Sequence, residues 1–284
     1  MTTTASNNGP DDLPASNSTA SHSTETAHKR YATYPSLKDR SVFISGGATG
    51  IGATLVSAFV AQGARVGFVD LDKAAGEALV EKLGANPATV HRPCFVACDV
   101  TEEAALNEAI ATVRAACGPI TILVNNAAND KRHRIEETSY AFWDKGIAVN
   151  LRHQFFAAQQ VMEDMKQAGG GSIVNFGSTS WKLKQGGMPA YTASKAAVQG
   201  LTRCLARDLG PFKIRVNTVV PGWVMTEKQL ALWVDDAAKD DIAKGQCINE
   251  PLLPEHIANM TLFLAADDSA MCTAQDFVVD GGWT

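Results

Sequence analysis

Tyr191 and Lys195 are the first candidates for chemistry, because a tyrosine and a lysine four residues apart share one face of an α-helix. Ser178 precedes the tyrosine by 13 residues and follows the apolar run 172–176, which predicts a buried strand. Open α/β sheets bind their ligands at the carboxyl ends of their strands, where this serine would lie. A phenol beside an ammonium ion could serve as a general base for a substrate hydroxyl. Alone the pair is weak evidence, since a solvated lysine beside a half-buried tyrosine is ordinary in helices.

A glycine-rich loop, Gly46–Gly52, follows the short β run Ser41–Ser45 and opens an amphipathic helix that is expected to end near Gln62. Glycines at the tip of a strand let the backbone turn tightly. They also let a pyrophosphate approach the helix N-terminus, where free N–H groups favour anions. A glycine-rich turn without a ligand is the alternative, but the order of strand, loop and helix favours a dinucleotide site.

Asp70 ends the next expected strand, 64–69, and lies 18 residues beyond Gly52. An acidic side chain at this place accepts hydrogen bonds from the ribose hydroxyls of adenosine and repels a 2′-phosphate. Gly47 occupies a position where loops that prefer NADP often carry a basic residue. Both features favour NAD as the cofactor over NADP, although Asp70 could also simply begin a helix before Asp72.

Strand and helix segments alternate along the chain from about residue 35, which predicts a parallel sheet with right-handed crossovers and helices on both faces. The expected strands are 41–45, 64–69, 94–97, 120–124, 172–176, 213–219 and 276–279. The further expected helices are 101–116, with Thr101 as N-cap, 150–168, a helix that carries Tyr191 and Lys195 as far as 209, and 255–265. The fold class is therefore α/β, a single doubly wound domain with a parallel seven-stranded sheet.

Two segments depart from this alternation. Residues 1–34 are rich in Ser, Thr, Asn and Ala, so we expect a disordered N-terminal tail before the domain at 35–284. The tail also lacks the apolar core of a signal peptide. Residues 223–254 contain Trp223, Trp233 and a mixed polar helix, and this long insertion is expected to form a lid over the site.

Composition argues against several classes of function. The 284 residues are 45% hydrophobic, enough for a full core, and no apolar run approaches the length of a membrane span. The net charge of −5 gives no indication of a nucleic-acid surface. The six cysteines are scattered without metal-like pairs, as in a reduced cytoplasmic protein. We therefore expect a cytoplasmic protein with a small-molecule ligand and no nucleic-acid, membrane or metal partner.

The order and spacing of these elements resemble those of the short-chain dehydrogenase/reductase family over about residues 35–284. The matching elements are the glycine loop, Asp70, Asp99, Asn126, Asn150, Ser178, Tyr191 and Lys195. The resemblance implies a Rossmann-type domain with a catalytic tetrad of Asn150, Ser178, Tyr191 and Lys195. It also implies a cofactor site made of Gly46, Thr49, Gly50, Ile51, Gly52, Asp70, Leu71, Asp99, Val100, Asn126, Ala127, Tyr191, Lys195, Pro221, Gly222, Val224 and Thr226.

The chemistry that this resemblance implies begins with Tyr191, which would take the proton of a substrate hydroxyl while the nicotinamide accepts a hydride. Tyrosine has an ordinary pKa of about 10, so Lys195 and the positive nicotinamide are expected to lower the pKa of Tyr191. Ser178 would hydrogen-bond the reacting oxygen, and Asn150 would hold a water that links Lys195 to solvent. Ala128 stands where the family usually has glycine, and its methyl group is expected to narrow the space beside the cofactor.

Several local stretches are similar to the bacterial aldose 1-dehydrogenases of this family, in particular D-xylose 1-dehydrogenases. They include NNAANDKRH at Asn125, NFGSTSW at Asn175, PGWVMTEKQ at Pro221 and the DGGW end. This resemblance implies NAD-dependent oxidation of an aldose at C1 to the lactone, the aldose being a pentose or 6-deoxyhexose such as xylose, arabinose or fucose. The expected substrate-side residues, polar and aromatic as suits a sugar, are Asn129, Asp130, His153, Ser178, Trp181, Gln185, Tyr191 and Trp223. As alternatives, the two tryptophans could be packing residues and His153 a core histidine.

Two other functions stay open on the same fold. A 3-oxoacyl or keto-steroid reductase would favour NADPH and a more apolar pocket, against which Asp70 argues. A cofactor-sensing regulatory protein tends to lose the tyrosine or the lysine, and this chain keeps both. The family resemblance also implies a homotetramer, in which Trp283 and Thr284 would border a neighbour's site.

Overall fold

The structure, a computed structural model, describes residues 31–284. Most of the expected tail, residues 1–30, lies outside the described residues, so its disorder stays a prediction. Regular structure begins with a 3-10 turn, η1 (Pro35–Leu37), whose Leu37 is fully buried. In residues 31–284 none of the helices combines the length and the apolar character that crossing a membrane would require.

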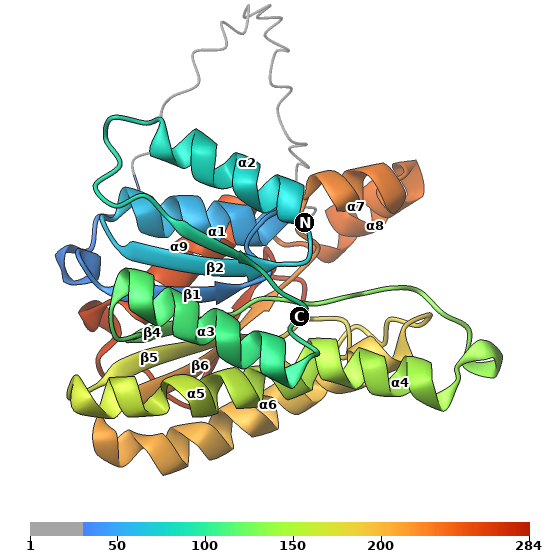
Figure 1. The fold of residues 1–284 in the computed structure, drawn as a ribbon. Helices are drawn as coiled ribbons and strands as arrows, with labels where there is room; N and C mark the ends of the chain where they lie inside the picture. The colour runs from blue at the N-terminus through green and yellow to red at the C-terminus, as the bar shows by residue number, and fades with distance from the viewer. Residues whose placement is uncertain (1–30) are drawn as a thin grey trace, which may run out of the picture. The chain divides into compact units, whose positions relative to one another are not determined.

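Seven parallel strands form one sheet in the order β3-β2-β1-β4-β5-β6-β7 (Figure 1). The strands are β1 (Ser41–Ser45), β2 (Arg65–Asp70), β3 (Cys94–Ala97), β4 (Ile122–Asn125), β5 (Gly171–Phe176), β6 (Ile214–Pro221) and β7 (Asp276–Val279). From β1 the chain winds to one edge at β3, returns to β4 beside β1, and continues to the other edge at β7. The doubly wound α/β fold with seven parallel strands is therefore confirmed.

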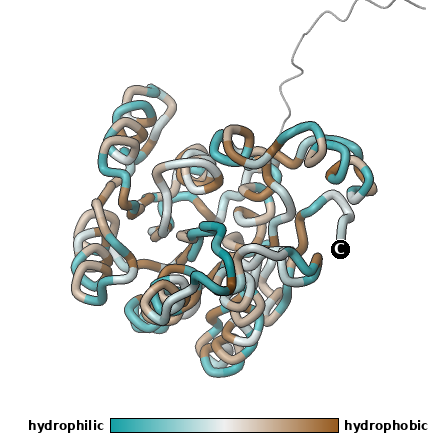
Figure 2. Tube along the Cα trace, turned by 90° about the vertical axis from the view of Figure 1, so that its right-hand side faces the viewer, coloured by the Kyte–Doolittle hydropathy of each residue, from teal (hydrophilic) through white to brown (hydrophobic). Residues whose placement is uncertain are grey.

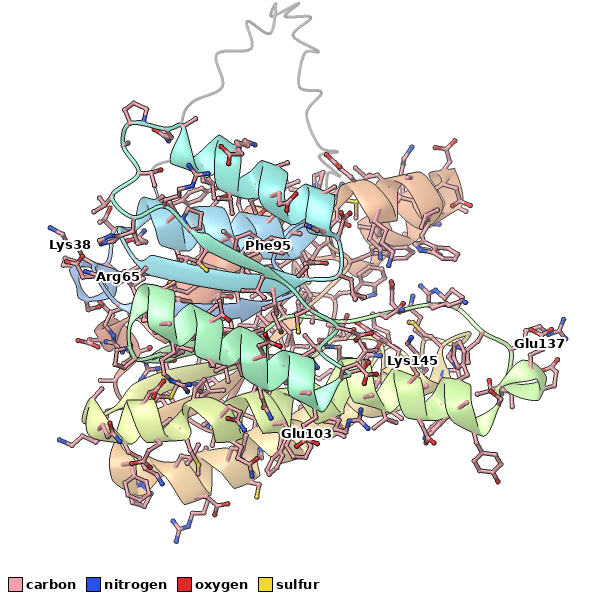
Figure 3. All side chains as sticks on the ribbon, in the orientation of Figure 1. Lys38, Arg65, Phe95, Glu103, Glu137 and Lys145 are labelled. Atoms are coloured by element: carbon pink, nitrogen blue, oxygen red, sulfur yellow. The ribbon has the colours of Figure 1, made fainter. Side chains whose placement is uncertain are left out.

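Helices cover both faces of the sheet in two layers (Figure 1). One face carries α1 (Gly50–Ala61), α2 (Lys73–Gly84) and α9 (Pro254–Ala265). The other carries α3 (Glu103–Cys117), α5 (His153–Gln167) and α6 (Pro189–Leu209). Hydrophobic and hydrophilic residues alternate along these helices (Figure 2), as expected of helices that bury one side against a sheet. Charged side chains such as Lys38, Glu103 and Glu137 point outward (Figure 3).

The central strand β1 shows why the sequence has continuous apolar runs at the sheet. All five residues of β1 are buried. Val42 and Ile44 pack on the side of α1 and α9, whereas Phe43 packs on the side of α3 and α5. A parallel strand between two helical layers has no solvated face, so apolar side chains suit both of its sides.

The helix expected from Asn150 begins ten residues earlier and is interrupted. α4 (Tyr140–Ile147) starts after its N-cap Ser139, whose Oγ accepts a hydrogen bond from Phe142 N at 3.2 Å. A π-helical turn, η3 (Ala148–Arg152), then leads into α5. Such turns occur often at functional sites, and this one contains Asn150 of the implied tetrad.

The expected lid at 223–254 contains two short helices, α7 (Glu227–Leu232) and α8 (Asp236–Gly245). Thr226 caps α7 by accepting a hydrogen bond from Gln229 N at 3.3 Å. Asp235 caps α8 by accepting one from Ala238 N at 2.8 Å. Both caps are local signals of a helix start, and the mixed polar helix expected in this insertion is two separate helices.

Candidate active site

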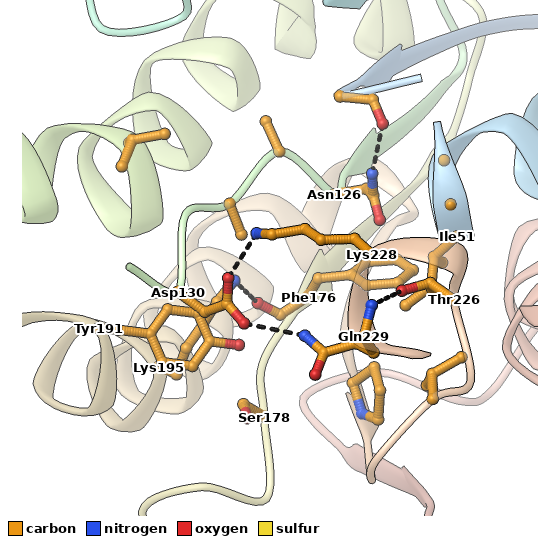
Figure 4. A pocket seen from close by; sticks show the side chains of 18 of the residues that line it. Ile51, Asn126, Asp130, Phe176, Ser178, Tyr191, Lys195, Thr226, Lys228 and Gln229 are labelled. Atoms are coloured by element: carbon orange, nitrogen blue, oxygen red, sulfur yellow. Dashed lines mark hydrogen bonds and ion pairs between the residues drawn. The ribbon is translucent and has the colours of Figure 1, made fainter. Parts of the chain in front are cut away.

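A cavity of about 730 Å³ opens at the carboxyl ends of the central strands (Figure 4). It is lined by the glycine loop after β1, the loop after β4, the ends of β5 and β6, and the first turns of α6 and α7. Every residue expected to hold a cofactor lines this cavity. Parallel sheets place their ligands at such a switch point, where the chain turns from one half of the sheet to the other.

The glycine loop fits the close approach of a dinucleotide. Gly46 and Gly50 have φ angles of +68° and +53°, values that favour glycine. A Cβ on Gly52 would lie 1.8 Å from the carbonyl oxygen of Gly46, so the first turn of α1 packs directly on the loop. Asn126 fixes this arrangement, because its Nδ2 donates to the Gly46 carbonyl at 2.7 Å. Thr49, the N-cap of α1, makes no side-chain cap hydrogen bond, which leaves the helix N-terminus to a ligand.

Two carboxylates stand at the ends of the neighbouring strands β2 and β3. Asp70 accepts hydrogen bonds from Ala48 N at 2.9 Å and Asp72 N at 3.1 Å, so its carboxylate is oriented by the glycine loop. Asp99 accepts from the backbone N and the Oγ1 of Thr101 at 2.9 and 2.7 Å. Burial works to raise the pKa of Asp99, but these hydrogen bonds outweigh it and hold the pKa below its ordinary value. Thr101, expected to cap α3, orients Asp99 instead, and Glu102 is the N-cap.

Tyr191 and Lys195 lie on the first two turns of α6, with the ammonium 5.7 Å from the centre of the tyrosine ring. Lys195 is 1% exposed, and its Nζ donates to the carbonyl oxygen of Phe176, the last residue of β5, at 2.7 Å. Ser178 lies two residues after Phe176. Its side chain lines the cavity together with those of Tyr191 and Lys195. The structure thus brings together the serine, tyrosine and lysine that the sequence singled out.

Burial shifts the pKa values of both Tyr191 and Lys195. Loss of water raises the pKa of Tyr191 to about 12, against a smaller opposing effect of its hydrogen bond with Ser178. Burial also lowers the pKa of Lys195 to about 7. Burial therefore favours the neutral form of both groups in the protein without cofactor. The expected lowering of the pKa of Tyr191 by Lys195 and the positive nicotinamide together stays a prediction.

Asn150 is buried in η3 and does not line the cavity. Its Oδ1 accepts from Asn129 N at 2.8 Å, and its Nδ2 donates to the carbonyls of Asn129 and Gly146 at 3.1 and 2.9 Å. The side chain therefore ties the loop after β4 to the π-helical turn, and its contacts are with backbone groups of these two segments.

The expected substrate residues divide into two groups. Ser178, Gln185, Tyr191 and Trp223 line the cavity, as does Asp130. Those outside its lining are Asn129, His153 and Trp181.

His153 shows why part of this expectation needs correction. It is 1% exposed beneath the loop after β4, with its Nε2 3.3 Å from Ser45 Oγ. Burial, together with the charge of Lys195, lowers the pKa of His153 to about 3. His153 is therefore the neutral core histidine of the alternative interpretation, and it does not line the cavity.

Comparison with known proteins identifies the family. Residues 46–284 match the family model described as enoyl-(acyl carrier protein) reductase. The chain belongs to the short-chain dehydrogenase/reductase family. It is therefore an oxidoreductase, and members of this family bind nicotinamide cofactors.

Curated relatives include sugar dehydrogenases. A D-xylose 1-dehydrogenase of Caulobacter vibrioides is 43% identical over 89% of this chain and 98% of its own length. A probable galactose dehydrogenase, GalD, of Rhizobium meliloti is 43% identical over 88% of this chain and 96% of its own length. Among solved structures, a short-chain dehydrogenase/reductase from Mycobacterium ulcerans superposes with a TM-score of 0.83 at 26% identity, covering 89% of this chain and 91% of that one.

In this short-chain dehydrogenase/reductase, α7 is tied across the cavity to the loop after β4. Lys228 Nζ donates to Asp130 Oδ1 at 2.7 Å, and Gln229 Nε2 donates to Asp130 Oδ2 at 3.0 Å (Figure 4). Burial works to raise the pKa of Asp130, and these two donors hold it below its ordinary value. Gln229 also accepts from Trp223 Nε1 at 3.1 Å. The sequence analysis did not predict that Lys228 and Gln229 belong to the site. The helix cap at Thr226, followed by a short helix, was the signal that could have placed them there.

Lys228→Ala should loosen α7. The variant removes the ion pair with Asp130, so amide hydrogen exchange in residues 230–234 should become faster by about two- to fivefold, as expected for a pair with one exposed partner. Exchange measured by mass spectrometry tests this. Lys239→Ala is the matched control, because Lys239 pairs with Asp236 within α8 and both side chains are largely exposed. Equal exchange in the wild type and Lys228→Ala would show that the ion pair does not hold α7.

Proposed function

We propose that this enzyme oxidises an aldose at C1 to the lactone with NAD as the hydride acceptor. The observation that carries the proposal is the polar and aromatic cavity lining, with Asp130, Gln185 and Trp223, beside Tyr191 and Ser178. A sugar offers hydroxyl groups to the polar side chains and an apolar ring face to an indole. The sugar dehydrogenases among the relatives support the same substrate class.

The residues around the cavity suit a dinucleotide, and each part of the dinucleotide would lie against residues that can bind it. The pyrophosphate would lie on the glycine loop at the N-terminus of α1, and the adenosine ribose would lie at Asp70. Asn126 and the β6 end at Pro221 would flank the nicotinamide. When bound there, NAD supplies the acceptor for the hydride of C1.

The protein's own residues handle the proton. As the C1–H bond breaks with its electron pair, the C1–O double bond forms and the hydroxyl proton passes to Tyr191 Oη. Ser178 would hydrogen-bond this oxygen and fix its angle. Lys195 would donate to a cofactor hydroxyl and stabilise the phenolate, because its ammonium lies close to the ring of Tyr191. The homotetramer that the family resemblance implies stays a prediction beside this scheme.

A substrate panel tests the sugar assignment. Purified enzyme with NAD should reduce the cofactor with D-xylose, L-arabinose, D-galactose or L-fucose, followed at the nicotinamide absorbance, and the product should be a lactone by NMR. The panel also contains a hydroxysteroid, a 3-oxoacyl thioester with NADPH, and simple hydroxy acids. Turnover of the steroid or the thioester without turnover of any aldose would refute the sugar assignment while leaving an oxidoreductase. No turnover of any compound would favour a cofactor-sensing protein.

Tyr191→Phe should lower kcat for sugar oxidation by about 10² to 10⁴, because it removes the proton acceptor. In the wild type the raised pKa of Tyr191 means that the phenolate fraction grows as pH rises. The rate of oxidation should therefore rise with pH between 6 and 9, and that of the reverse reduction should not. Steady-state kinetics in both directions measure this. A wild-type oxidation rate independent of pH over that range would contradict Tyr191 as the base.

Asp70→Asn should weaken the preference for NAD, since the amide no longer repels a 2′-phosphate. We expect kcat/KM for NADP to rise relative to NAD by about tenfold or more, as loss of a charged repulsion and a charged acceptor implies. Asp72→Asn is the matched control, because the Asp72 side chain caps α2 through Ala75 N and does not line the cavity, and the substitution keeps the backbone N–H that Asp72 donates to Asp70. A wild-type enzyme that is more efficient with NADP than with NAD would refute the argument from Asp70.

A further inference from the structure

The last residues of the chain fold back into the site. Asp280 is 4% exposed; its Oδ1 accepts from Gly282 N at 2.8 Å, and its Oδ2 accepts from the backbone N and Oγ1 of Thr284 at 2.8 and 3.0 Å. Gly281 and Gly282 have φ angles of +70° and +85°, which lets the backbone close around this carboxylate. Trp283 lies between Gly282 and Thr284, whose backbone N–H groups both donate to Asp280. Its side chain lines the cavity of its own chain. The expectation that Trp283 borders a neighbour's site stays a prediction.

The segment after α8 anchors this turn. Cys247 N and Ile248 N both donate to the carbonyl oxygen of Gly281, at 2.8 and 2.9 Å. At the end of α8, a Cβ on Gly245 would lie only 2.3 Å from Cε2 of Trp283, so the indole packs directly on the backbone of the helix. A glycine at this position provides the space that the indole occupies.

The indole of Trp283 stacks beside that of Trp223, with ring centres 6.5 Å apart and planes inclined by 18°. Both rings line the cavity. The N–H of Trp223 is engaged by Gln229 Oε1 at 3.1 Å, so its position is fixed from α7 as well. The two rings are thus held by three separate segments: α7, the end of α8 and the C-terminal turn.

We propose that Trp283 is a specificity-determining residue, which with Trp223 forms the aromatic wall that packs against the apolar face of the aldose ring. This inference deepens the proposed function and rests on it. Rigid aromatic side chains give a large contact area with little loss of conformational freedom. The C–H groups on one face of the aldose ring would pack on this wall, while Asp130 and Gln185 in the same cavity would be available to its hydroxyl groups. The C-terminal residues are in this way part of the sugar site.

The experiment compares steady-state kinetics of the wild type, Trp283→Ala and Trp283→Phe with the preferred aldose and NAD. Trp283→Ala should raise KM for the aldose about tenfold, whereas kcat and the KM for NAD should stay within about twofold. Trp283→Phe should recover most of the affinity, because a phenyl ring preserves an aromatic face. Trp143→Ala is the matched control, since Trp143 is an exposed tryptophan of α4 outside the cavity, and it should leave the KM for the aldose unchanged.

Gly245→Ala gives an independent test that substitutes no residue of the cavity lining. Its methyl group would occupy the space of the indole, so this variant should also raise the KM for the aldose. The double variant Gly245→Ala/Trp283→Ala should have the same KM as Trp283→Ala alone, because both changes act through one indole.

Three outcomes would overturn the inference, and they can be told apart. If the wild type oxidises an aldose but Trp283→Ala has an unchanged KM for it, the inference fails and the proposed function stands. If Trp283→Ala loses affinity for NAD and the aldose alike and Trp283→Phe does not restore it, the residue is only structural. If the wild type oxidises no aldose, the proposed function and the inference fail together.

Discussion

Burial of the Lys195 ammonium is the constraint around which the site is built. The side chain lines the cavity, is 1% exposed, and donates a single hydrogen bond, to the Phe176 carbonyl at 2.7 Å. An ammonium ion without water is costly, and burial accordingly lowers its pKa to about 7. Between this value and the ordinary 10.5, the unfolded chain binds the proton that the folded protein does not, so this group favours folding increasingly as pH rises. Below pH 7 Lys195 is charged in the folded protein as well, so the full free-energy cost of burying the ammonium ion destabilises the folded state.

A buried network of polar side chains holds together the strands and the helix around Lys195. Asn125 Nδ2 donates to Asn175 Oδ1 at 2.9 Å, and Asn175 Nδ2 donates to Thr202 Oγ1 at 2.9 Å. Thr218 Oγ1 is 2.8 Å from the same Thr202 oxygen. These bonds join β4, β5 and β6 to α6, which carries Tyr191 and Lys195. Paired polar groups in a low-dielectric interior specify one arrangement, since any shift leaves one of them unsatisfied.

Sequence reasoning succeeded where a residue's place follows from the backbone and failed where it follows from the direction of a side chain. Apolar runs located the strands, and residues at the strand ends, such as Asp70 and Ser178, were bound to meet at one edge of the sheet. The spacing of Tyr191 and Lys195 needed only a helix. His153 was different, because the π-helical turn before it changes the helical phase and sends its ring into the core.

Partners distant in sequence were the other limit. Asp130 and Lys228 are 98 residues apart, and no local pattern predicts their ion pair. The contacts of the C-terminal turn with Gly245 and Cys247 place Trp283 at the cavity of its own chain, which the sequence did not predict. Long-range packing of loops decides such positions, and a single sequence carries little record of it.

The same distant contacts connect α7 to Tyr191. The carboxylate of Asp130 adds to the rise in the pKa of Tyr191, whereas the charge of Arg132, on the same loop, opposes it. Lys228 and Gln229 engage both oxygens of Asp130, so α7 holds in place the charge that acts on the tyrosine. Arg132 in turn lies 5.2 Å from the ring of Trp233, just beyond the end of α7. Movement of α7 would therefore change both the size of the cavity and the electrostatic environment of Tyr191, because one set of contacts fixes both.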